Sequence, residues 1–179
     1  DFAIMGSSLF KALYPDDKAK VALLNIGSEE IKGNEVIKNT YQKLNQIHKN
    51  KEYEFKGYIE GNNLMNGDVN VIVTDGFTGN IALKTAEGTA KFITDNLKKS
   101  LNYISLLFSF FSLQNFKKKL DPRKYNGAIF LGLNGPVVKS HGGTDAIGFY
   151  YSIDLCYRII KGNLMHQIKN NLSHLDVKD

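Results

Sequence analysis

The residues from 70 to 88 most constrain the fold of this chain, because they combine a strand, a tight turn and a helix. The apolar run Val71–Val73 is typical of a buried strand. Asp75-Gly76 then gives a turn signal, and Thr78 or Asn80 is expected to cap the helix that follows. Such a junction can present backbone N–H groups to an anion at the positive end of the helix. An ordinary connection without a ligand explains the spacing equally well.

The same alternation of strands and helices recurs along the chain. Apolar runs predict strands at 21–26, 55–59 and 70–74. Helical periodicity predicts helices at 2–14, 34–49, 145–161 and 164–175. This alternation is typical of βαβ units, so we predict an α/β fold, a three-layer α/β/α sandwich with a mostly parallel sheet. The helix at 145–161 is expected to bury Ala146, Phe149, Ile153, Cys156, Tyr157 and Ile160.

A second glycine-rich stretch, residues 127–146, carries the strongest candidates for chemistry. Two short apolar runs flank Asn134-Gly135, and the second run ends in Lys139, Ser140 and His141. A helix start at Thr144 or Asp145 follows. A lone histidine is more often structural than catalytic, but α/β folds place their sites where a strand ends before a helix.

Polar residues follow several of the predicted strands. In a parallel sheet the loops after residues 26, 59, 74 and 138 are expected to converge at one edge. Taken singly, each polar residue there is more simply a solvated loop position or a helix cap, and only the convergence favours a site. The residues concerned are Asn25, Glu30, Lys32, Asn34, Glu60, Asp75, Thr78, Asn80, Lys139, Ser140, His141 and Asp145.

Long blocks of sequence, in order over most of the chain, carry a family resemblance. The blocks are Leu24-Asn25-Ile26-Gly27 with Glu30, Lys32-Gly33-Asn34-Glu35, Asp75-Gly76-Phe77-Thr78-Gly79-Asn80, Leu83-Lys84-Thr85-Ala86-Glu87-Gly88, Leu131-Gly132-Leu133-Asn134-Gly135 and Lys139-Ser140-His141-Gly142. Together they resemble the C-terminal part of the PlsX-type phosphate acyltransferases. Members of that family begin with an N-terminal half of similar size, so residues 1–179 are expected to be the C-terminal part of such a domain, without that half.

The resemblance implies a function and partners that composition alone does not. It implies transfer of a fatty acyl group from acyl carrier protein to inorganic phosphate, giving acyl phosphate for phospholipid synthesis, without a cofactor. It implies a fold like that of isocitrate and isopropylmalate dehydrogenases, related to the phosphate acetyltransferases. A homodimer and a downstream membrane glycerol-3-phosphate acyltransferase are the further partners expected. The alternative is an incomplete fragment that only binds acyl carrier protein or membrane.

The chemistry of acyl transfer suggests a role for each candidate. Lys139 and the amides of Thr78, Gly79 and Asn80 are expected to bind phosphate. His141 is expected to donate to the thioester oxyanion or to protonate the leaving thiolate. Ser140 orients phosphate or, less simply, acts as a nucleophile, and Asp75 or Asp145 orients the histidine or the lysine. The other substrate-binding candidates are Asn25, Lys32 and Asn34.

Charge and cysteine content fit this setting. The net charge of +5 suits an acidic carrier protein, phosphate or an anionic membrane surface, although a lysine-rich genome explains it too. No aromatic-interleaved basic motif indicates nucleic acid, and no ligand spacing or complete dinucleotide fingerprint indicates a metal or nicotinamide. The absence of clustered metal-binding aspartates also disfavours a dehydrogenase. The single cysteine, Cys156, is compatible with a reducing compartment.

The residues from 98 to 120 predict a projecting amphipathic helical hairpin. Apolar side chains dominate the segment, and lysines lie at both of its ends. A membrane surface fits this pattern, and a dimer-interface or core helix fits it equally well. The resemblance implies both membrane attachment and dimer contact. The side chains expected to make these contacts are Leu106, Leu107, Phe110 and Phe111. We therefore expect a cytoplasmic protein that associates peripherally with membranes.

Overall fold

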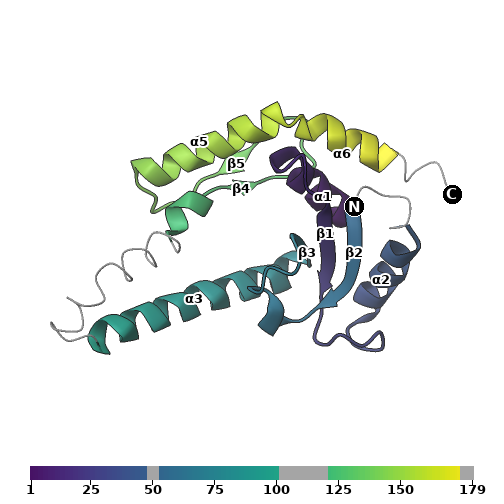
Figure 1. Ribbon diagram of the computed structural model, residues 1–179, viewed down its shortest axis with the longest axis horizontal. Helices are drawn as coiled ribbons and strands as arrows, with labels where there is room; N and C mark the ends of the chain where they lie inside the picture. The colour runs from purple at the N-terminus through teal and green to yellow at the C-terminus, as the bar shows by residue number, and fades with distance from the viewer. Residues whose placement is uncertain (48–52, 101–120, 174–179) are drawn as a thin grey trace.

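The computed structural model describes residues 1–47, 53–100 and 121–173 (Figure 1). The elements of the first part are α1 (Phe2–Leu13), β1 (Ala19–Leu24), α2 (Glu35–Ile47), β2 (Tyr53–Ile59), the 3₁₀ turn η2 (Gly61–Asn63), β3 (Val71–Val73) and α3 (Gly76–Ser100). The elements of the last part are η3 (Pro122–Tyr125), β4 (Ala128–Ile129), β5 (Val138–Lys139), α5 (Ala146–Lys161) and α6 (Leu164–Ser173).

The central sheet is parallel and has the strand order β2-β1-β3. Val21 pairs with Val71 and Leu23 with Val73, so the two apolar runs that most suggested strands are neighbours in one sheet. Val21 and Ala22 lie on opposite faces of β1, and both are fully buried. The predicted α/β fold with a mostly parallel sheet is therefore confirmed. The predicted strand at 21–26 extends too far, because Ile26 is 81% exposed.

A bulge in β2 lets two aromatic rings contact one helix. Along β1 the pairing moves from Val21 opposite Phe55 to Leu23 opposite Tyr58, so β2 has one extra residue there. Gly57, at φ +83°, adopts the left-handed backbone that this irregularity requires. Tyr41 of α2 consequently packs against the rings of both Phe55 and Tyr58. Without the bulge, two residues three apart on a strand would face opposite sides of the sheet.

Helix α1 belongs to two hydrophobic cores. Ala3 and Ile4 pack on the sheet with Val21 and Leu23, in a core to which Leu44 of α2 also belongs. The opposite end of α1 supplies Ala12 to a second core, completed by Ile159, Leu164 and Ile168. Figure 1 shows α1 between the sheet and the layer formed by α5 and α6. These contacts place both α1 and α2 on the face of the sheet that carries Val21 and Leu23, so the third layer of the sandwich stays a prediction.

Strands β4 and β5 form a separate antiparallel ribbon. Ala128 pairs with Lys139 and Ile129 with Val138, and the ribbon contributes Ile129, Leu131 and Val138 to the core beneath α5. The expectation that the loop after residue 138 shares the edge of the parallel sheet is therefore wrong. Each of these strands is only two residues long. The apolar run that ends in β5 does not by itself indicate which strand pairs with β5.

Helix α5 buries a different face from the one predicted. Gly148, Ser152 and Ile159 are its buried residues, whereas Phe149, Ile153, Tyr157 and Ile160 are all more than half exposed. Cys156 is half-buried and Ala146 is exposed. The prediction assumed that the apolar stripe faces inward, but the small and polar stripe does, and its Gly148 and Ser152 are hydrogen-bonded to Asn126 between η3 and β4.

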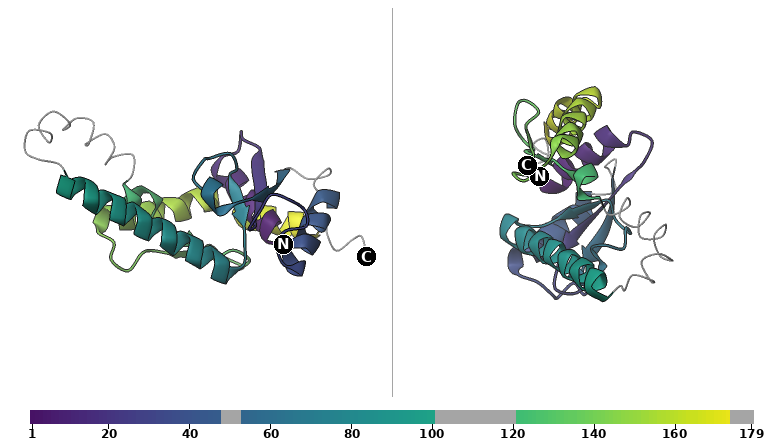
Figure 2. Two further views of the ribbon diagram at one scale, coloured as in Figure 1. Left: turned by 90° about the horizontal axis from the view of Figure 1, so that it is seen from below. Right: turned by 90° about the vertical axis from the view of Figure 1, so that its left-hand side faces the viewer.

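Helix α3 extends away from the sheet, as Figure 1 and the left view of Figure 2 show. Most of its side chains are exposed, including Phe77, Ile81, Leu83, Phe92 and Ile93. Within the part of the chain that the structure describes, no helix is long and apolar enough to cross a membrane. The predicted hairpin contacts Leu106, Leu107, Phe110 and Phe111 lie outside the described residues.

Candidate active site

The segment Lys139-Ser140-His141 lies where strand β5 ends and the connection to α5 begins. Lys139 and His141 are exposed, and Ser140 is half-buried. The backbone of His141 is held on both sides, since its N–H donates to Asn126 Oδ1 at 3.0 Å and its carbonyl accepts from the N–H of Thr144 at 3.1 Å. The three chemical groups expected from the sequence are thus adjacent on a fixed backbone.

The ring of His141 is oriented by the glycine pair that follows it. The N–H of Gly143 donates to His141 Nδ1 at 3.2 Å. A backbone N–H can only donate, so Nδ1 must be the unprotonated nitrogen of a neutral ring. The proton of that neutral ring is then on Nε2, which becomes the donor. This is the form that can give a hydrogen bond to a developing oxyanion.

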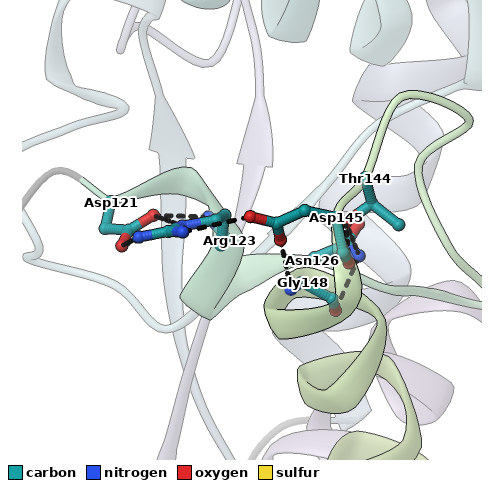
Figure 3. Close-up of polar contacts among 6 residues, drawn as sticks. All are labelled: Asp121, Arg123, Asn126, Thr144, Asp145 and Gly148. Carbon is teal, nitrogen blue, oxygen red and sulfur yellow. Dashed lines mark hydrogen bonds and ion pairs between the residues drawn. The ribbon is translucent and has the colours of Figure 1, made fainter.

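Asn126, between η3 and β4, joins this segment to helix α5 and was not found from the sequence. Figure 3 shows its side chain beside Thr144 and Gly148. The Asn126 amide nitrogen lies within 3.1 Å of four oxygens, which belong to Ser140 (2.9 Å), Thr144 (3.0 Å), the Gly148 carbonyl (2.8 Å) and Ser152 (3.1 Å). In the sequence, Asn126-Gly127 reads only as an ordinary turn signal before an apolar run.

An arginine clamps the start of α5 to η3, as Figure 3 shows. Arg123 pairs with Asp121 at 2.7 Å and with Asp145 at 3.1 Å. The hydrogen bond from Arg123 lowers the pKa of Asp121 to about 2. Asp145 caps α5 by accepting the N–H of Gly148 at 2.9 Å. That bond first, and Arg123 second, hold the pKa of Asp145 below its ordinary value. Asp145 is therefore engaged with Arg123 and the helix, and the structure gives no sign that it orients His141 or Lys139.

The candidates after β1 shape their own loop. Asn25 is buried, donates from Nδ2 to the carbonyl of Lys32 at 3.1 Å and accepts from the N–H of Ile26 at 2.9 Å. Asn34 Oδ1 accepts from the N–H of Ile37 at 2.9 Å, as a helix cap does. Lys32 is exposed. These bonds explain Asn25 as a loop residue and Asn34 as a helix cap. A substrate role for either stays a prediction.

The candidates after β3 are also engaged with one another. Asp75, and not Thr78 or Asn80, caps α3, because its Oδ1 accepts from the N–H of Thr78 at 2.9 Å. The N–H of Gly79 donates to the Asp75 carbonyl at 3.0 Å. Hydrogen bonds from Thr78, side chain first, hold the pKa of Asp75 below its ordinary value. Two of the three amides expected to bind an anion, those of Thr78 and Gly79, are thus bonded to Asp75. Phosphate binding by Thr78, Gly79 and Asn80 stays a prediction.

A hollow of about 470 Å³ lies at the carboxyl ends of β1 and β3. Its walls come from α1, α2 and the two strand ends, and they are mainly apolar, with Asn34 and Asp75 among the polar lining residues. Lys139 belongs to the other sheet, and His141 follows the end of β5. The structure thus gives two groups of candidates, one at the edge of the parallel sheet and one at the end of the ribbon. In neither group, nor elsewhere among the described side chains, do three or more metal-binding residues gather.

Comparison with known proteins identifies the family of this chain. A family model described as "Fatty acid synthesis protein" matches residues 1–167. A phosphate acyltransferase of Pelagibacter ubique is 69% identical over 177 residues, which are 96% of this chain and 53% of that protein. Phosphate acyltransferases of Agrobacterium fabrum and Parvibaculum lavamentivorans are 42% and 44% identical, over 96% and 97% of this chain and 50% and 49% of those proteins.

The chain therefore spans about half the length of the curated relatives that it matches. The matches extend over nearly all of this chain, including both groups of candidate residues. The resemblance seen in the sequence is confirmed: the chain belongs to the fatty acid synthesis protein family, that of the PlsX-type phosphate acyltransferases.

Proposed function

We propose that the protein containing this chain transfers a fatty acyl group from acyl carrier protein to inorganic phosphate, for phospholipid synthesis. A phosphate oxygen attacks the thioester carbonyl carbon, and the tetrahedral oxyanion then collapses as the carbon–sulfur bond breaks. The products are acyl phosphate and the carrier thiol, whose sulfur takes up one proton. Phosphate is already a nucleophile, so the enzyme needs only to position it and to stabilise charge.

The observation that carries the proposal is the held, exposed ring of His141. With Nδ1 accepting from Gly143 at 3.2 Å, the Nε2–H of the neutral ring is left for substrate. A donor on a fixed backbone suits the oxyanion, because preorganised donors stabilise charge as it develops in the transition state. The proton that the departing sulfur takes up comes from the attacking hydrogen phosphate, which loses it in forming acyl phosphate. The neutral ring donates a hydrogen bond and keeps its proton, since losing that proton would leave an imidazolate.

Lys139 and Ser140 are the proposed phosphate contacts. Lys139 is exposed at the end of β5, two residues before His141, and it offers a positive charge close to the proposed donor. Ser140 Oγ already accepts from Asn126 at 2.9 Å, so its own hydroxyl hydrogen remains to be donated to a phosphate oxygen. This supports the role of orienting phosphate over that of a nucleophile, which would need a base within reach of Oγ.

Replacing His141 and Lys139 tests this assignment. In the protein purified from its own gene, His141→Ala and Lys139→Ala are each expected to lower acyl phosphate formation by about 10²-fold, the size typical of a lost acid or oxyanion donor. The product is trapped with hydroxylamine and quantified. His166→Ala is the matched control, since His166 is an exposed histidine of α6 and should leave the rate unchanged. An active wild type whose rate survives both replacements contradicts these roles, and an inactive wild type contradicts the function.

The proposal also includes the setting expected for such an enzyme: a cytoplasmic homodimer, bound peripherally to anionic membrane, that hands acyl phosphate to a membrane glycerol-3-phosphate acyltransferase. The exposed apolar side chains of α3 and α5 support association with further polypeptide, because large exposed apolar surfaces usually mark interaction sites. The net charge of +5 supports an acidic carrier protein and an anionic surface as partners.

A further inference from the structure

We propose that Asn126 is a positioning residue: it fixes the Ser140–His141 segment against α5 and thereby directs Nε2–H of His141 toward substrate. The inference rests on the proposed function, since it concerns the same histidine. It assigns a role to a residue that neither the sequence motifs nor the simple chemistry of acyl transfer points to.

The first support is the orientation of the Asn126 amide. Its oxygen accepts from the N–H of His141 at 3.0 Å, and its nitrogen lies 2.8 Å from the carbonyl oxygen of Gly148. Exchanging the amide oxygen and nitrogen would set two acceptors against each other at Gly148 and two donors against each other at His141. Both ends of the amide are therefore specified by backbone groups that cannot change their role.

The second support is the excess of acceptors around the nitrogen. The NH₂ group has two hydrogens, yet four oxygens lie within 3.1 Å of it. Three of these oxygens are hydroxyls, which can turn and donate elsewhere, as Ser152 does toward the Asn126 carbonyl at 3.4 Å. The cluster therefore converges on one amide from the β5 end, the connection and α5, and it fixes their relative positions.

The consequence for His141 follows from its own bonds. His141 is exposed, and among the described residues its ring is held at one nitrogen, by Gly143. The direction of Nε2 thus depends on the backbone of residues 141–143, whose first N–H is held by Asn126. Loss of the Asn126 oxygen releases the start of the connection between β5 and α5. A misplacement of a catalytic group by about 1 Å can lower the rate about 10²-fold.

A purely structural role makes a different prediction, and three variants separate the two. Asn126→Ala removes both halves of the amide. Asn126→Asp keeps an oxygen for the N–H of His141 but sets a carboxylate oxygen against the Gly148 carbonyl. Asn171→Ala is the matched control, because Asn171 is another asparagine whose side chain bridges two elements, by donating to Ser8 at 3.1 Å.

The experiment measures kcat, KM and the ring nitrogen chemical shifts of His141 by NMR, in the native protein and well below each variant's melting temperature. For Asn126→Ala we expect a 10- to 100-fold lower kcat, a KM for the acylated carrier within about twofold of wild type, and loss of the single neutral tautomer with its proton on Nε2. Asn126→Asp should recover most of the kcat lost in Asn126→Ala and keep the neutral tautomer of His141, even if it melts at a lower temperature than Asn126→Ala. Asn171→Ala should change melting temperature only.

Unchanged kcat and ring shifts in Asn126→Ala would overturn the proposal. So would a loss of kcat in all three variants that simply follows their melting temperatures. If the wild type forms no acyl phosphate, the proposed function fails, but the ring shifts still decide whether Asn126 holds His141.

Discussion

At Gly162, just after α5, the backbone of Ala12 in α1 occupies the space that a side chain would need. An added Cβ would collide with the Ala12 carbonyl oxygen and lie 2.8 Å from the carbonyl carbon. Backbone atoms within a helix cannot turn aside, so Gly162→Ala is expected to lower the free energy of unfolding by about 1–3 kcal/mol, as overpacking does. Urea denaturation of wild type and variant measures the difference.

The control for this prediction is Gly88, in the middle of α3. Among the described residues, and apart from the backbone of α3 itself, no heavy atom lies within 4 Å of a Cβ placed there. Gly88→Ala should therefore raise the free energy of unfolding by up to about 1 kcal/mol, because alanine favours helix more than glycine does. Equal effects at the two sites would contradict the close contact between α1 and the end of α5.

At the scale of the element, the buried face of α5 can be tested by two isoleucines of the same helix. Ile159 is 1% exposed and belongs to the core with α1 and α6, whereas Ile153 is 56% exposed. Ile159→Ala should cost about 2–5 kcal/mol, the usual loss for a buried isoleucine. Ile153→Ala should cost less than about 1 kcal/mol, since little area leaves water there. Thermal melts of both variants decide between the buried face of α5 seen in the structure and the apolar face predicted from the sequence.

The ion pairs of Arg123 with Asp121 and Asp145 make the free energy of unfolding depend on pH in a defined window. Because Arg123 lowers the pKa of Asp121 to about 2, and the pKa of Asp145 is also lowered, folding favours the charged carboxylates. Their contribution is full above the ordinary carboxyl pKa of about 4 and is lost as pH falls through the lowered values toward 2. Arg123→Gln should melt at a lower temperature than wild type at pH 6, and the gap should narrow steadily as the pH falls from 4 to 2.5. A constant gap over this range would show that the clamp does not act through charge.

At the scale of the whole molecule, we predict reversible binding to anionic vesicles through the segment 98–120. Its lysines should each contribute about 1 kcal/mol near anionic lipid, so salt should weaken binding, while the apolar side chains should prevent its complete loss. Replacing Leu107 and Phe110 with Glu should release the protein from vesicles of phosphatidylglycerol and phosphatidylcholine in a flotation assay.

The matched control adds the same two charges elsewhere, as Leu83→Glu and Phe92→Glu at two exposed apolar positions of α3. That variant should still float with the vesicles. Release by both pairs would show that added charge alone is responsible, and release by neither would make the segment a protein contact.

The sequence by itself determined the elements, the parallel sheet and the family, because strand runs, turn residues and helical periodicity are local properties. It also placed Lys139, Ser140 and His141 side by side, since adjacent residues need no fold to bring them together. Tertiary structure decided which strand β5 pairs with and which face of α5 is buried. Asn126 is hydrogen-bonded to Gly148 and Ser152 of α5, 22 and 26 positions away, on the small and polar stripe that faces inward. Hydrophobic periodicity carries no record of such bonds.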